Sequence, residues 1–228
     1  MSDPALEEKM FGRLIIFDGR NGTIIKWMQT PDRRESYYPP QILSSSSGEK
    51  VILFGTGGNS RSGSLFVISI KDLLDRRIEA AKQIYKDENK GMLTPATLAD
   101  INQDGVQDII IATFGSNVIA FDGKDYKPLW NTTFDQSESY STLAVGYYDE
   151  DDIPDFLVKY QYGKGYPVYQ YEQTVVLSGK DGSKISRILT DSIGSQSSPL
   201  TISVRGHGND VFLHWMANCK GSIHKSRG

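Results

Sequence analysis

The feature that most constrains the fold is a repeat of strand-forming segments that runs through the whole chain. One set of segments joins an apolar strand to a tight turn and a second strand, and it aligns at spacings of 51, 53 and 56 residues on Phe17, Ile68, Phe121 and Leu177. In a second set an apolar strand begins at a polar residue, and it aligns at spacings of 58, 47 and 55 residues on Lys50, Asp108, Asp155 and Asp210. Two independent registers therefore return one period of a little over 50 residues.

The composition of each repeat indicates β-sheet. The segments are rich in Val, Ile, Phe and Tyr, which suit a pleated and half-buried surface, and short Gly-containing turns separate them. Consecutive strands joined by short turns pair as antiparallel hairpins. A period near ~50 residues with about four strands per unit is typical of a β-propeller blade. The predicted fold is all-β: a β-propeller of four-stranded antiparallel blades.

The extent of the repeat predicts a partial propeller. We expect residues 1–228 to form a single propeller segment of about three to four blades, more readily part of a larger propeller than a closed four-blade ring. Within residues 71–85, Leu74, Ile78, Ala81 and Tyr85 have helical spacing, which predicts one short inserted helix. Residues 219–228 are predicted to be a flexible basic tail.

Charge and composition exclude several classes of protein. A net charge of −3 and a pI near 5.7 argue against nucleic-acid binding, which needs a surplus of Lys and Arg. No window approaches ~18 uninterrupted apolar residues, and the first residues lack a basic start followed by an apolar run, so no membrane span or signal peptide is expected in this chain. The single cysteine, Cys219, allows no internal disulfide; it is either buried or pairs outside the chain.

Residues 100–108, with the sequence DINQDGVQD, have the spacing of a calcium loop. Oxygen-bearing side chains recur at positions 1, 3, 5 and 9, and Gly105 permits the sharp bend at position 6. Position 12 is Ile111 rather than Glu, and a strand follows, which excludes a helix-flanked calcium hand. A solvated Asp/Asn/Gly turn is the alternative. The expected calcium ligands are the side chains of Asp100, Asn102, Asp104 and Asp108 and the carbonyl of Val106.

The repeat contains a weaker second version of this loop. The aligned segment YYDEDDIPD keeps Asp149, Asp151 and Asp155, but Tyr147 replaces the first carboxylate and Asp152 replaces the glycine. The aligned segments LSSSSGEKV and SVRGHGNDV hold too few carboxylates and are expected to bind no metal. A turn that recurs both with and without an expected metal site indicates a structural rather than a catalytic role for the metal.

Other candidate residues are few. The triplets Asn21-Gly22-Thr23 and Asn131-Thr132-Thr133 are possible N-glycosylation sites. The only histidines are His207, His214 and His224, from which no Ser-His-Asp arrangement can be built. His214 is expected to point outward from a strand, and no catalytic residue is predicted.

The acidic loop, continuing through IIIATFGSN, resembles the FG-GAP repeat of integrin alpha-chain propellers. The turns FDGRNGTIIKW and FDGKDYKPLW resemble those of quinoprotein-type propellers. Over residues 11–218 the chain is most similar to a family of animal membrane proteins called family with sequence similarity 234, members A and B. The FG-GAP resemblance implies calcium binding by the loop. The resemblance to family 234 implies an extracellular propeller that follows a membrane span, which this chain lacks, without enzymatic activity, and it makes the two sequons plausible.

Two functions follow as expectations. The first is a non-enzymatic scaffold or protein-interaction ectodomain whose protein partner is unknown. The alternative is a quinoprotein-like dehydrogenase, suggested by the turns that end at Trp27 and Trp130. Because the two tryptophans occupy equivalent strand ends, packing between blades is the favoured role for both.

Overall fold

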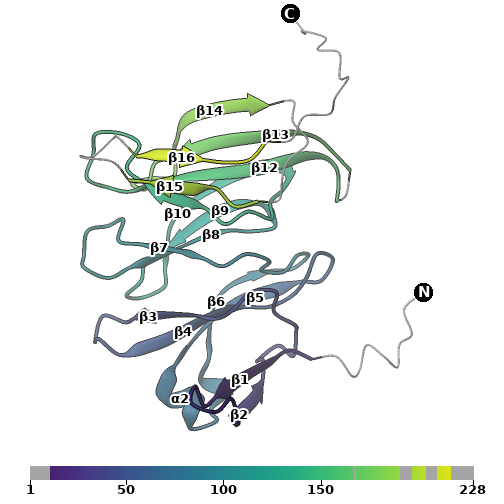
Figure 1. Cartoon of the computed structure of the whole chain (residues 1–228), viewed down its shortest axis with the longest axis vertical. Coiled ribbons are helices and arrows are strands. Elements are labelled where there is room, and N and C mark those ends of the chain that lie inside the picture. The colour runs from purple at the N-terminus through teal and green to yellow at the C-terminus, as the bar shows by residue number, and fades with distance from the viewer. Residues whose placement is uncertain (1–10, 167, 191–196, 204–209, 217–228) are drawn as a thin grey trace, which may run out of the picture. The chain divides into compact units, whose positions relative to one another are not determined.

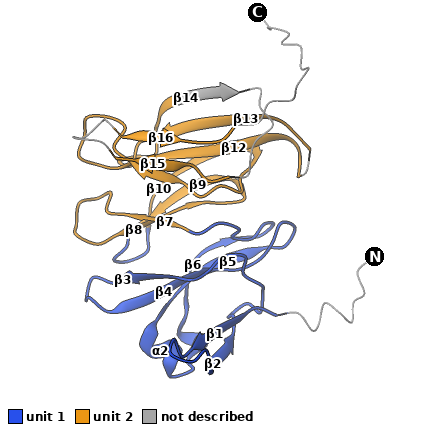
Figure 2. Ribbon diagram, viewed as in Figure 1, with its two compact units in different colours: residues 1–95, 122–127 blue, residues 96–121, 128–228 orange. Residues whose placement is uncertain are grey.

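The computed structural model describes residues 11–166, 168–190, 197–203 and 210–216 (Figure 1). The chain forms two compact units, one of residues 1–95 and 122–127 and the other of residues 96–121 and 128–228 (Figure 2). Cys219, His207, His224 and the predicted tail 219–228 lie outside the described residues.

A four-stranded antiparallel meander and a hairpin make up the first unit. The meander has the order β3-β4-β5-β6 and consists of β3 (Gln41–Ser44), β4 (Lys50–Gly55), β5 (Gly63–Ser69) and β6 (Lys82–Asp87). The hairpin pairs β1 (Arg13–Phe17) with β2 (Ile24–Gln29). Their apolar faces form one core, in which the rings of Phe54 and Phe66 stack at 5.5 Å.

The second unit repeats the meander twice. The first copy consists of β7 (Thr97–Ala99), β8 (Asp108–Ala112), β9 (Gly115–Phe121) and β10 (Pro128–Glu138). The second consists of β11 (Ala144–Gly146), β12 (Asp155–Gly165), β13 (Val168–Leu177) and β14 (Lys184–Thr190). Pairing of Ser137 with Tyr162 and of Glu138 with Gln161 joins the two copies into one eight-stranded sheet. A hairpin of β15 (Leu200–Ile202) and β16 (Val211–Leu213) follows.

The predicted all-β architecture of four-stranded antiparallel meanders is therefore confirmed. How many blades the propeller has, and whether residues 1–228 form a single segment, remain predictions. Among the described residues no helix is long or apolar enough to cross a bilayer.

The prediction of one short inserted helix is confirmed, but its bounds of 71–85 are wrong for most of their length. The α-helix, α2, spans only Ile70–Leu74; Ser69 caps it by accepting the N–H of Asp72, and Arg76 then takes a φ of 62°. A short 3₁₀ turn, η1 (Ile78–Ala80), leads into β6, which pairs with β5. The helical spacing misled because β5 needs a partner for its backbone N–H and C=O groups, and pairing outweighs a weak local preference.

Trp130 packs one meander of the second unit against the next. Its side chain is 9% exposed, and its Nε1 donates a hydrogen bond to the carbonyl of Gly179 at 2.8 Å. Gly182 has a φ of +73°, and a Cβ there would lie 2.6 Å from Cε3 of the indole. The turn between β13 and β14 therefore lies directly on Trp130, which confirms the packing role expected for this tryptophan.

Trp27 does not share that role, although it occupies the equivalent strand end. Its side chain is 50% exposed, and the Arg13 guanidinium lies 4.7 Å from the ring centroid. The packing role expected for Trp27 is wrong in this structure, because no described turn covers the β1–β2 hairpin as the β13–β14 turn covers Trp130.

The two tryptophans give a matched test of this packing. We expect Trp130→Ala to lower the free energy of unfolding by about 3–5 kcal/mol, because it removes a large buried ring and a hydrogen bond. Trp27→Ala should cost about 1 kcal/mol or less, since it removes a half-exposed ring and a surface cation–π contact. Urea unfolding followed by circular dichroism measures both changes, and equal losses would contradict the packing role of Trp130.

Candidate metal loops and a buried ion pair

The predicted calcium loop connects β7 to β8, and Asp108 is the first residue of β8. Asp108 is 0% exposed, and its Oδ2 accepts the backbone N–H groups of Ile101 at 2.9 Å and of Asn102 at 3.3 Å. Its Oδ1 lies 3.4 Å from the side-chain amide nitrogen of Asn102. A buried carboxylate thus fastens the beginning of the loop to the strand that ends it.

The other predicted ligand side chains accept hydrogen bonds from backbone N–H groups in the middle of the same loop. Asp100 accepts the N–H of Asp104 at 3.1 Å and that of Gly105 at 2.8 Å. Asn102 Oδ1 also accepts the N–H of Asp104, at 3.1 Å, and Asp104 Oδ1 accepts that of Val106 at 2.9 Å. Gly105 takes a φ of +83°, the left-handed conformation that the bend requires. All four predicted side chains are therefore brought onto one short loop.

The loop has the right kind of oxygen donors for a hard cation, but the donors face the backbone. No group of three or more His, Cys, Asp or Glu side chains within the described residues has a geometry that could hold a metal ion. Calcium requires six to eight oxygens around one centre. For these residues to fit calcium, the side chains must turn from the loop N–H groups toward the ion.

The loop between β11 and β12 follows the same scheme. Asp155, 1% exposed, accepts the N–H groups of Tyr148 at 2.9 Å and Asp149 at 3.2 Å, as Asp108 does for its own loop. Asp149 accepts the N–H of Asp151, and Asp151 accepts that of Ile153. Burial raises the pKa of Asp155, although its backbone donors act in the opposite direction. The alignment of the two loops therefore corresponds to equivalent hydrogen bonding.

The other aligned loops differ at this position. Lys50 begins β4 where Asp108 begins β8, and its Nζ donates to Ser44 Oγ at 2.6 Å. The segment SVRGHGNDV lies partly outside the described residues, but Asp210 accepts the N–H of Tyr147 at 2.9 Å. That the two segments bind no metal remains a prediction.

Both predicted glycosylation sites are on the surface. The side chain of Asn21 is exposed in the β1–β2 turn, where its Oδ1 accepts the N–H of Thr23 at 3.0 Å and the hydroxyl at 2.8 Å. Asn131 is exposed on β10. Both amides are accessible, and their modification remains a prediction.

Sequence reasoning missed a buried ion pair. Lys159 of β12 and Glu172 of β13 lie 3.3 Å apart, with side chains 1% and 0% exposed. Lys159 Nζ also donates to the carbonyl of Trp215 at 2.8 Å, and Glu172 accepts hydrogen bonds from Gln161 and Thr174. Burial raises the pKa of Glu172, and Lys159 partly offsets this. The available signal was a charged residue inside each of the apolar segments DFLVKY and YEQTVVL.

His214 lies beside this pair instead of pointing outward from a strand. β16 ends at Leu213, and the His214 ring is half-buried after it. Burial lowers the pKa of His214, and the positive charge of Lys159 adds to the effect. The expected outward orientation is therefore wrong.

Removal of one partner of the ion pair should be far more harmful than removal of both. We expect Glu172→Gln to cost about 3–5 kcal/mol, because it leaves the Lys159 ammonium buried without its counter-charge. A double variant, Lys159→Met with Glu172→Leu, should recover most of that loss, since apolar replacements of a buried pair are often neutral. Urea unfolding of Lys159→Met, Glu172→Leu and the double variant measures the coupling, and Glu172→Gln measures the loss of the counter-charge alone.

The exposed pair Lys127–Asp125, with Nζ and Oδ2 2.6 Å apart, provides the control for this cycle. Its neutralisation should leave the unfolding midpoint unchanged because water screens both charges. Strictly additive losses at Lys159 and Glu172 would contradict a coupled pair.

Comparisons with known proteins identify no family. No protein-family model and no curated protein matches the chain. The chain is similar to parts of three solved structures. The V. cholerae biofilm matrix protein Bap1 is 18% identical over 76% of this chain and 24% of that chain, with a TM-score of 0.47. A europium-containing methanol dehydrogenase is 10% identical over 69% and 26%, with a TM-score of 0.42. BamB from Moraxella catarrhalis is 12% identical over 89% and 78%, with a TM-score of 0.34.

The chain thus spans about a quarter of the first two of these structures. The resemblances to FG-GAP repeats and to family 234 remain predictions.

Proposed function

We propose that this chain is a β-propeller segment that acts as a non-enzymatic scaffold, with one calcium-binding loop that fixes a hairpin. The observation that carries the proposal is the repeated loop in which a buried aspartate fastens the turn to its strand. Asp108 and Asp155 do this in equivalent ways, but only the first loop carries the full set of oxygen side chains. A loop motif that recurs in successive repeats favours a structural role over a catalytic one.

The calcium ligands in this proposal are the carboxylates of Asp100, Asp104 and Asp108, the side-chain oxygen of Asn102 and the carbonyl of Val106. The N–H groups of the loop hold these side chains close together, so an ion needs only local rotations to gather them. In exchange it neutralises three carboxylates that repel one another on a short loop. Bound calcium would clamp the hairpin of β7 and β8.

The second loop would bind calcium more weakly, through Asp149, Asp151 and Asp155. It lacks a carboxylate at the first position, where Tyr147 stands, and Asp152 occupies the position of the flexible glycine. Fewer charged ligands lower calcium affinity.

A membrane-anchored, extracellular or lumenal setting is the part of the proposal that rests on resemblance to family 234. The accessible side chains of Asn21 and Asn131 are compatible with a glycoprotein in that setting. A protein partner is part of the scaffold role, and the proposal leaves its identity open.

The alternative, a quinoprotein-like dehydrogenase, depends on the tryptophan turns. Trp130 is engaged in packing against Gly179 and Gly182, so its presence needs no catalytic explanation. Trp27 stacks with Arg13 at the surface. The scaffold is therefore the better-supported function.

Calcium should raise the melting temperature of the chain, because binding to the folded state alone stabilises it by about 2.7 kcal/mol at one hundred times the Kd. The measurement is a thermal melt with millimolar calcium and with chelator. Asp104→Ala should abolish the calcium-dependent rise, whereas Asp135→Ala, on the exposed surface of β10, should retain it. An unchanged wild-type melting temperature would contradict calcium binding. The loop would then be a turn that is held only by its own hydrogen bonds.

The scaffold role predicts no turnover with an added quinone. Purified chain would be incubated with pyrroloquinoline quinone, calcium, short alcohols and a reducible dye, and dye reduction would be followed by absorbance. We expect no rate above that of the mixture without protein. Saturable dye reduction that disappears on heat denaturation would favour the dehydrogenase instead.

A further inference from the structure

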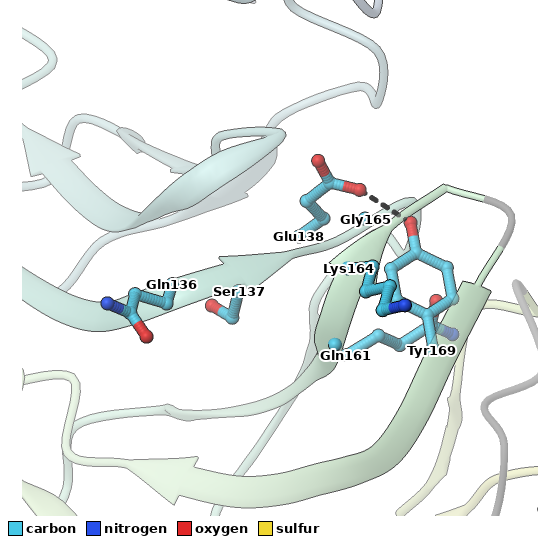
Figure 3. A pocket seen from close by; sticks show the side chains of 8 residues that line it. Gln136, Ser137, Glu138, Gln161, Lys164, Gly165 and Tyr169 are labelled. Carbon is cyan, nitrogen blue, oxygen red and sulfur yellow. Dashed lines mark hydrogen bonds between the residues drawn. The ribbon is translucent and has the colours of Figure 1, made fainter.

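A pocket of about 360 Å³ lies in the second unit where β10 pairs with β12 (Figure 3). The side chains around it are mainly polar and come from β10, β12 and β13. They include two glutamines, a serine, a carboxylate, a lysine and a tyrosine: Gln136, Gln161, Ser137, Glu138, Lys164 and Tyr169. None of these residues belongs to the acidic loops, so the pocket is a separate feature of the molecule.

Irregular backbone on both strands forms the pocket. The pairing of β10 with β9 shifts register between Thr133 and Glu138, and Gln136 takes a φ of 57°. The pairing of β12 with β13 shifts at Gly163 and again at Gly165, which has a φ of 94°. Bulges and left-handed residues interrupt ladders and cost free energy, and they concentrate at binding sites. Irregular segments of two strands, β10 and β12, therefore meet at this pocket.

Gln161 supplies a polar atom that the fold leaves unsatisfied. Its side chain is 3% exposed, and its amide hydrogen-bonds to Glu172. Because a carboxylate only accepts, the amide nitrogen of Gln161 must be the donor in that bond, which fixes the orientation of the amide group. The other end of the amide, Oε1, accepts no hydrogen bond within the described part of the chain. A buried acceptor without a donor is unfavourable, and because Oε1 has almost no exposed surface, a hydroxyl from the pocket satisfies it only when a neighbouring side chain moves aside.

A second polar group in the pocket is fixed by its neighbours. Glu138 Oε2 accepts the hydroxyl of Tyr169 at 2.7 Å, the bond drawn in Figure 3, and the N–H of Tyr166 at 3.0 Å. Burial raises the pKa of the Tyr169 phenol, so the phenol keeps its proton and remains a donor. The carboxylate is therefore held in one position at the pocket wall.

The pocket has no net charge that would favour a charged ligand. The carboxylate of Glu138 is offset by the ammonium group of Lys164. Donors and acceptors are mixed around an aromatic ring, which matches molecules whose hydroxyl groups both donate and accept. The volume is at the lower end of the range for small-molecule sites, so it suits a single ring rather than a large cofactor.

We propose that this pocket binds a neutral, hydroxyl-rich small molecule of the size of one sugar ring, with Glu138 and, after a small side-chain movement, Gln161 Oε1 as hydroxyl acceptors. Lys164 and Gln136 lie at the exposed rim and donate to the outer hydroxyls. The ring of Tyr169 provides a flat apolar surface for the C–H face of the ligand. The site makes no use of the calcium loops and is independent of them.

The test is a titration of the isotope-labelled full chain followed by amide chemical shifts. The probes are D-glucose, D-galactose, D-mannose and N-acetyl-D-glucosamine, each raised to tens of millimolar, with methylammonium and inorganic phosphate as charged probes. We expect at least one sugar to give saturable shifts at residues 136–138 and 161–169. No saturable shift with any sugar, or shifts with a charged probe alone, would overturn the proposal and leave a water-filled pocket.

Variants separate the pocket from other surfaces. Gln161→Leu should weaken sugar binding about tenfold, because it removes the buried acceptor. Lys164→Ala should also weaken binding, whereas Lys180→Ala, an exposed lysine in the β13–β14 turn, should not. If Gln161→Leu unfolds the chain, the comparison of Lys164→Ala with Lys180→Ala still tests whether the sugar binds in this pocket. Equal affinities in wild type, Lys164→Ala and Lys180→Ala would overturn the proposed site.

Discussion

The carboxylate of Asp108 accepts two backbone N–H groups from its own loop while it stands, buried, at the first position of β8. Asp155 does the same at the first position of β12. A buried carboxylate is unfavourable unless hydrogen bonds compensate for its lost hydration. These hydrogen bonds therefore stabilise the conformation of each loop. The short inner strands β7 and β11 are held beside β8 and β12 in this way, and the rest of each meander extends from that point.

The two meanders of the second unit are also joined by a contact that depends on small residues. Trp130 reaches the carbonyl of Gly179, and Gly182 leaves room for the indole face. A side chain at Gly182 would collide with Trp130, and its φ of +73° also disfavours other residues. One large ring and two glycines thus add a side-chain contact to the strand pairing that joins these two meanders.

Polar groups inside the second unit form a connected set. Lys159 is neutralised by Glu172, Glu172 receives the amide of Gln161, and the other end of that amide belongs to the pocket proposed to bind a sugar-sized ligand. Such a set is stable only when each member has its partner, because low dielectric strengthens both satisfied and unsatisfied interactions. This links the stability of β12 and β13 to the chemistry of the pocket.

The sequence by itself determined the repeat, the strand type of its segments and the position of the acidic loops. Alternation of apolar and turn residues is a local property, and the spacing of Asp100, Asn102, Asp104 and Asp108 follows directly from the chain. Only the tertiary structure decided which strands pair, which side chains are buried and which polar groups bond to one another. Residues 82–87 became a strand because β5 required a partner, and Trp130 was buried while Trp27 was not, because only one of them met a covering turn. The pairing of Lys159 with Glu172 and the pocket around Gln161 depend on how paired strands bring their side chains together, since burial and hydrogen-bond partners are properties of packed neighbours.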